Sequence, residues 1–142
     1  MRPEEAAERA FEAQAKAAVA ALLGGPERVE EGPFHGQLEA SVFPRLNFYA
    51  AGPASDMAGS QRVIVTAETR VWQQADQDGS RAQLREIDGT LATALEEVVV
   101  EQPGHRVHVL TVGSFQPIPG NHPNIRGRRR VYSFQVIAHA QT

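Results

Sequence analysis

The fold can be read most directly from residues 126–140, RGRRRVYSFQVIAHA. From position 131 onward, the large side chains of Tyr132, Phe134 and Val136 alternate with residues of the opposite parity. This period of two predicts a β-strand with one buried face. Four arginines come at the start of this strand and are expected to form a dense positive cluster there: Arg126, Arg128, Arg129 and Arg130.

The charges of the chain are distributed unevenly. All 17 acidic residues lie before Gln102, together with nine of the 14 basic residues. Residues 102–142 hold five arginines and no Asp or Glu. Such polarity indicates contact with a charged partner, which could be nucleic acid, an acidic protein or another copy of this chain.

Length and composition limit the possible classes of protein. A chain of 142 residues is expected to form a single domain over residues 1–142, large enough for one core. It contains no cysteine, which excludes disulfides and thiolate metal sites. No apolar run approaches the ~20 residues of a membrane helix. The acidic, Ala-rich N-terminus does not look like a signal peptide, so no membrane partner is expected.

The apolar periodicity predicts the order helix, strand, strand, helix, strand, strand. The helices are expected over residues 3–23 and 81–99, and the strands over 42–51, 61–73, 105–113 and 131–140. Residues 78–80 are expected to form a turn that caps the second helix. Residues 52–60 and 113–127 read as long, mobile, partner-facing loops. We therefore predict an α+β domain, with a mainly antiparallel sheet of about four to five strands and two α-helices packed on it.

The predicted strands carry apolar residues on both faces. One parity gives a core face: Val63, Val65, Val107, Val109, Tyr132 and Phe134. The other parity gives a second apolar face: Ile64, Trp72, Leu110, Val112, Val131 and Ile137. Either the two helices cover opposite faces, or the second face meets another subunit. In the second case copies associate through this face and the sheet edges, and Trp72→Glu should favour the monomer without unfolding it.

No pattern of catalytic or ligand-binding residues stands out. The chain has no P-loop and no glycine fingerprint after a strand. His105 and His108 are three apart on a predicted strand, so they point to opposite faces and do not form a metal site. Adjacent carboxylates such as Glu96 and Glu97 diverge on a helix. We therefore expect no catalytic residue, no metal and no cofactor.

Three interpretations of the arginine cluster remain open. The arginines could be a solvated loop edge, or they could contact carboxylates of another subunit or partner protein. They could also contact DNA phosphates, although a sequence pI of about 5.9 and 6% aromatic residues weaken that interpretation. Acidic side chains for a protein contact are plentiful on the first helix and after the second: Glu4, Glu5, Glu8, Glu12, Glu96, Glu97 and Glu101.

Two local motifs, together with the element order, resemble a known family. The strand led by Val42-Phe43-Pro44-Arg45-Leu46 and the closing Arg130-Val131-Tyr132-Ser133-Phe134 are similar to those of tail terminator proteins of long-tailed phages, the lambda minor tail protein U class. The resemblance covers most of the chain. Head-completion and connector proteins of the phage neck, of similar size, give a comparable impression.

The resemblance implies a structural, non-enzymatic role. Members of the family form a hexameric ring that caps the tail tube, stops its growth and presents the joint to the head. The implied partners are further copies of the chain, the tail tube protein, the head-completion protein, and DNA that passes through the lumen without sequence-specific binding. The implied location is the head-proximal end of the tail in the virion, after assembly in the host cytoplasm.

The residues expected at the oligomer or partner interface come from the second apolar face and the arginine cluster. They are Ile64, Trp72, Leu110, Val112, Arg126, Arg128, Arg129, Arg130 and Val131. The alternative class is a small enzyme or ligand-binding α+β domain with a pocket between sheet and helix. The mass of the particle in solution separates a ring from such a domain.

Overall fold

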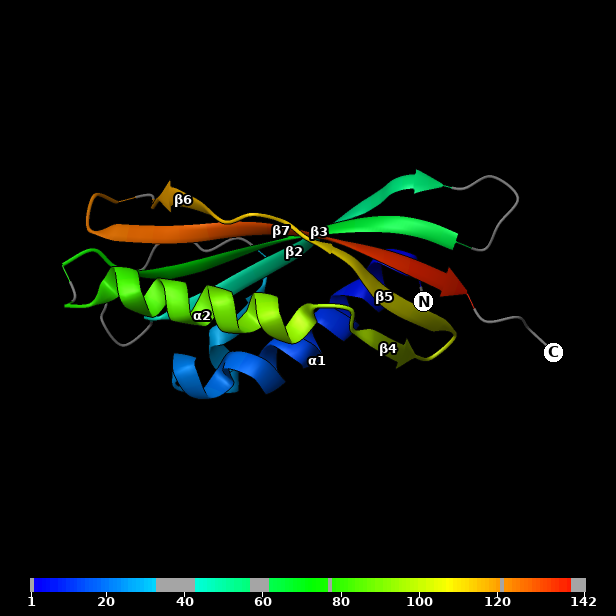
Figure 1. Cartoon of the computed structure of the whole chain (residues 1–142), viewed down its shortest axis with the longest axis horizontal. Helices are drawn as coiled ribbons and strands as arrows, with labels where there is room; N and C mark the ends of the chain where they lie inside the picture. Colours follow the sequence, from blue (N-terminus) through cyan, green and yellow to red (C-terminus); the bar gives the residue numbers. More distant parts are fainter. Residues whose placement is uncertain (1, 33–42, 57–61, 77, 121, 139–142) are drawn as a thin grey trace.

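Two helices lie on one face of a seven-stranded sheet in the computed structural model (Figure 1). The structure describes residues 2–32, 43–56, 62–76, 78–120 and 122–138. The elements are α1 (Pro3–Leu23), a short 3-10 helix η1 (Pro26–Arg28), β1 (Val29–Glu31), β2 (Arg45–Asp56), β3 (Arg62–Gln74), α2 (Ser80–Leu95), β4 (Val99–Gln102), β5 (His105–Val112), β6 (Gln116–Pro119) and β7 (Ile125–Ala138).

The sheet has the strand order β1-β2-β3-β7-β5-β4. β6 lies outside this order: it pairs with the first residues of β7, on the same edge as β5 and beyond the end of β5. The β1–β2 pair is parallel and all other pairs are antiparallel. The α+β class is confirmed, but the sheet is mixed and has more strands than predicted. The additional strands β1, β4 and β6 have three or four residues each, too few to show a clear alternation.

The first helix follows its prediction at both ends. Pro3 occupies the first turn and the acidic Glu4 and Glu5 follow it, where they complement the positive end of the helix dipole. Gly24 ends the helix in the left-handed conformation, with φ 94°, and its N–H donates to the carbonyl of Ala20. One side of α1 is buried against the sheet and α2: Ala6, Ala7, Ala10, Phe11, Ala15, Val19 and Leu23.

The second helix is shorter than predicted. It begins at Ser80, after Gly79 in the left-handed conformation, and no side chain caps it. It ends at Leu95, although the apolar spacing continues to Val98. The residues that follow include three successive valines, which favour strand because their β-branched side chains are restricted in helices. They lead into β4, which pairs with β5.

Both predicted loops contain strand. β2 continues to Asp56 through an irregularity in register between Ala51 and Ser55, so the hairpin loop predicted at 52–60 is replaced in part by strand. Residues 57–60 of that prediction lie outside the described residues. Within 113–127, β6 pairs with the first residues of β7. Two of the four residues of β6, Pro117 and Pro119, have no backbone N–H.

The main core lies between the helices and the sheet. Phe11 of α1 is at its centre, with ring centroids 5.0 Å from Phe48, 5.6 Å from Tyr132 and 6.1 Å from Phe134. The apolar stripe of α2 joins the same core through Leu84, Ile87, Leu91 and Leu95. Since both helices share this core, they do not cover opposite faces. No described helix lies on the other face of the sheet, hereafter the helix-free face (Figure 1).

Candidate functional site

The pleat of β7 divides the arginine cluster between the two faces of the sheet. Arg126, Arg128 and Arg130 have the parity of the buried Tyr132 and therefore lie on the helix-covered face. Arg129 has the opposite parity and lies on the helix-free face. The cluster that is continuous in sequence is thus two separate sets of cations.

On the helix-covered face, Asp88 of α2 binds two of the arginines. Its side chain is fully buried and accepts hydrogen bonds from Nε of Arg128 at 2.6 Å and from Nη2 of Arg130 at 2.7 Å. Arg130 also donates to the carbonyl of Gly113 at 2.6 Å. The hydrogen bond with Asp88 raises the pKa of Arg130 above its ordinary value. These contacts attach α2 to β7 and neutralise part of the cluster.

The sequence contained a signal for Asp88 that the analysis of charges missed. Asp88 follows Leu84 by four residues and precedes Leu91 by three, which places it on the apolar side of α2. A carboxylate buried among apolar residues requires a cationic partner. The partner could not be identified from sequence alone, because it lies 40 residues further along the chain.

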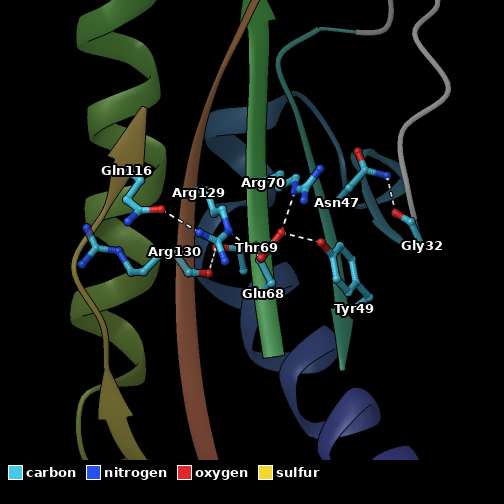
Figure 2. Close-up of polar contacts among 9 residues, drawn as sticks. All are labelled: Gly32, Asn47, Tyr49, Glu68, Thr69, Arg70, Gln116, Arg129 and Arg130. Carbon is cyan, nitrogen blue, oxygen red and sulfur yellow. Dashed lines mark hydrogen bonds and ion pairs between the residues drawn. The ribbon is translucent and has the colours of Figure 1, made fainter. Parts of the chain in front are cut away.

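On the helix-free face, Glu68 of β3 is the centre of a hydrogen-bonded network (Figure 2). It accepts from Tyr49 of β2, from Arg70 at 2.6 Å and from Arg129 of β7. Arg129 donates in turn to Gln116 of β6 at 2.6 Å, so the network joins four strands. Burial alone would raise the pKa of Glu68, but the hydrogen bonds from these three side chains outweigh it and lower the pKa.

The predicted interface residue Trp72 is buried within the chain. It is 6% exposed and packs with Phe43, Ile125 and Ile118 in a second, smaller apolar cluster. Gly127 lies opposite Trp72 in the strand register. A Cβ atom at Gly127 would lie 2.6 Å from the Trp72 ring, so this position requires glycine. Trp72→Glu is therefore expected to destabilise the fold, contrary to the expectation that it leaves the fold intact.

A bulge in β5 changes the predicted second apolar face. Val109 pairs with Phe134 and Thr111 with Ser133, so Leu110 is an extra residue in this strand. Val112 then pairs with Tyr132 and packs against the main core instead of facing outward. Leu110 is 43% exposed. The residues left on the helix-free face are half-buried and lie in β3 and β7: Ile64, Val131 and Ile137.

A groove lies where α2 begins, beside the β6–β7 hairpin. Its volume is about 690 Å³. Its polar lining is cationic, from Arg81, Arg85, Arg126 and Arg128, and its apolar lining includes Phe115 and Ile118. The guanidinium of Arg128 lies 3.5 Å from the centre of the Phe115 ring, a cation–π contact. Phe115 remains 47% exposed.

The structure brings together only part of the predicted interface. Arg126 and Arg128 line the groove, Arg130 binds Asp88, and Arg129 belongs to the network on the other face. Sequence reasoning did not identify Arg81, Arg85 or Phe115 as lining residues. Among the described residues no group of three or more His, Asp or Glu side chains could hold a metal ion. Neither described helix has the length and apolar character needed to span a membrane.

Comparison with known proteins gives similarity at the level of the fold. No family model matches the chain, and no curated protein matches its sequence. The fold is similar to a chain of the virion of a native gene transfer agent particle, with a TM-score of 0.58 and 16% identity over 89% of this chain and 90% of that chain. A second solved structure gives a TM-score of 0.58 at 19% identity, over 96% of this chain and 94% of that chain.

Proposed function

We propose that this chain is a structural protein of a phage-like particle, and specifically a tail terminator. In this role it forms a ring that caps the tail tube, ends its polymerisation and provides the joint to the head. The observation that carries the proposal is the similarity in fold, over about nine-tenths of both chains, to a chain of a gene transfer agent virion. The local motifs of the family resemblance support the same role.

The proposal includes partners and a location. The chain assembles with further copies of itself into a ring, which we propose to be a hexamer. It contacts the tail tube protein on one side and a head-completion protein on the other, and DNA passes through the lumen without sequence-specific contacts. It acts without catalysis or a cofactor, at the head-proximal end of the tail, after assembly in the host cytoplasm.

Tube length provides the direct test. Tail tube protein from the same virus is polymerised in vitro with and without this chain, and tube lengths are measured by negative-stain electron microscopy. A terminator gives shorter tubes with a ring at one end, in proportion to the amount added, because capped ends stop growing. Tubes of unchanged length and without terminal density would contradict the proposal.

A head-completion protein is the second candidate, because its size and element order are similar. It would bind the portal end of a DNA-filled head and leave tube length unchanged. The ligand-binding alternative is favoured by one observation, the cationic groove between α2 and the β6–β7 hairpin. It predicts a monomer or dimer, and light scattering at high protein concentration separates it from a ring.

A further inference from the structure

The groove between α2 and the β6–β7 hairpin carries positive charge that the described residues do not neutralise. Arg81, Arg85 and Arg126 form no ion pair among the described residues, whereas Arg128 beside them is bound to Asp88. Arg81 and Arg85 are exposed on the first turns of α2. The groove therefore combines free guanidinium groups with an exposed apolar surface at Phe115, a combination suited to an anionic protein segment.

The N-terminal half of α1 carries the complementary charge. Burial raises the pKa of Glu8, and repulsion from Glu31, Glu5, Glu4 and Glu12 raises it further. Within this acidic patch, Glu5 and Glu12 are paired with Arg9 and Lys16. Glu8 is repelled by its acidic neighbours, and neither Glu4 nor Glu8 has a cationic partner among the described residues.

The two surfaces lie in different halves of the molecule. In Figure 1 the start of α2 and the β6–β7 hairpin are at the left end, and the N-terminal turns of α1 are in the right half. One chain therefore cannot bring its own patch into its own groove. Contact between the groove of one copy and the patch of the next is head-to-tail, and such a contact generates a closed ring when the rotation between copies closes.

We propose that the groove formed by Arg81, Arg85 and Arg126 receives the acidic patch around Glu4 and Glu8 of a neighbouring copy. The inference rests on the self-assembly included in the proposed function, and it identifies which surfaces meet. The apolar lining at Phe115, Ile118 and Pro117 favours a helix surface over a phosphate backbone, and the net charge of −3 also disfavours nucleic acid.

Two charge reversals test the contact. The first variant carries Arg81→Glu and Arg85→Glu, and the second carries Glu4→Lys and Glu8→Lys. Each places like charges at the interface with its own copies, so each should associate at least about tenfold more weakly than wild type. An equimolar mixture should recover wild-type association. When the two variants alternate around a ring, the acidic groove of the first variant meets the basic patch of the second, and the basic groove of the second meets the acidic patch of the first.

The control for surface charge carries Arg62→Glu and Arg106→Glu, two exposed arginines that both lie opposite Ile137 at the other end of β7. Among the described residues, Arg106 is already paired with a carboxylate of its own chain, that of Glu101, which the two reversed groove arginines are not. This control variant should associate as wild type does.

Association is measured by analytical ultracentrifugation, and folding by circular dichroism. Glu8→Lys removes repulsion within the patch, whereas Glu4→Lys replaces a carboxylate that complements the helix dipole. Association is therefore compared at a temperature at which circular dichroism shows that every variant is folded.

Several outcomes would overturn the inference. These are normal association of either reversed variant, failure of the mixture to recover association, or a wild type that stays monomeric at high concentration. A loss of affinity for a random DNA duplex in the first variant, with association unchanged, would make nucleic acid the occupant of the groove. The proposed function is judged separately by tube length, which does not depend on which surfaces meet.

Discussion

Asp88 is the side chain on which the arrangement of the arginines depends. It is fully buried, and its two partners Arg128 and Arg130 have side chains only 15% and 13% exposed. Removing charges from water is costly, and the cost is offset here by several short hydrogen bonds to one carboxylate. The two ion pairs of Asp88 therefore fix the position of α2 on β7 as well as contributing to the stability of the fold.

Asp88→Asn should lower the free energy of unfolding by about 3–5 kcal/mol, because it leaves two largely buried arginines without a counter-charge. Urea denaturation followed by circular dichroism measures the change. Asp78→Asn, at an exposed position just before α2, is the control and should have little effect. Equal stability of the two variants would mean that the buried ion pair contributes nothing to the fold.

Gly127→Ala should destabilise the protein by about 1–3 kcal/mol, because the new methyl group would overlap the Trp72 ring. Gly89→Ala is the matched control, since nothing lies within 4 Å of a Cβ atom there and Gly89 is in the interior of α2. It should stabilise by about 0.5–1 kcal/mol. Thermal and urea unfolding measure the change in stability of each variant. Changes of the same sign in Gly127→Ala and Gly89→Ala would contradict the prediction.

At the scale of single elements, the β6–β7 pairing gives order to a segment that the sequence predicts to be a mobile loop. The amide of Gly120 donates to the carbonyl of Ile125, and that of Gly113 to the carbonyl of Val131. We therefore expect slow hydrogen exchange at Gly113 and Gly120, resolved by NMR. Exchange at these two amides as fast as in an unstructured peptide would support the loop prediction instead.

The acidic side of α1 should make stability depend on pH in a defined direction. The pKa of Glu8 is raised in the folded protein, so the folded state holds the proton more tightly than the unfolded state. The contribution of Glu8 to the free energy of unfolding therefore falls as pH rises through this pKa. Glu8→Gln should therefore raise the melting temperature at pH 7. The difference in melting temperature between Glu8→Gln and wild type should become smaller as pH falls toward about 4.

Glu68 provides the opposite case. The pKa of Glu68 is lowered by its three hydrogen-bond donors. The ionised side chain therefore adds to the free energy of unfolding at neutral pH, and this contribution is lost as pH falls through the folded-state pKa. Glu68→Gln should lower the melting temperature at pH 7, with a smaller difference in acid. Calorimetry of both variants at the two pH values would contradict this account if the effects had the same sign.

The elements that could be predicted from sequence are those with long, regular patterns. The helix at 3–23, the strand at 105–113 and the arginine-led last strand are all present, because their periodicity extends over many residues. The bulge at Leu110 could not be predicted, since inserting one residue reverses the parity of those that follow without changing composition. The division of the arginines between two faces follows from parity alone, but the partner Asp88 depends on tertiary packing.

At the scale of the whole molecule, the proposed contact between groove and acidic patch should be sensitive to salt. Raising NaCl from about 0.1 M to about 1 M shortens the Debye length from ~10 Å to ~3 Å and screens exposed charges. Assemblies observed by ultracentrifugation at low salt should therefore dissociate at high salt. Assemblies that persist would indicate a contact through the apolar residues of the helix-free face, such as Ile64 and Val131.

The edges of the sheet have a further consequence for a protein that works at high local concentration. An open strand edge can template the addition of further strands, which leads to fibres. Here the outer strands β1 and β4 have three and four residues, and β6 lacks backbone donors at Pro117 and Pro119. Among the described residues, these three strands themselves therefore offer only short or donor-poor edges. The longer edge belongs to β2, because β1 pairs only with Leu46, Asn47 and Phe48 among the described residues and β2 continues to Asp56. For a protein proposed to end the growth of one polymer, this part of β2 is the edge at which its own copies could join strand to strand.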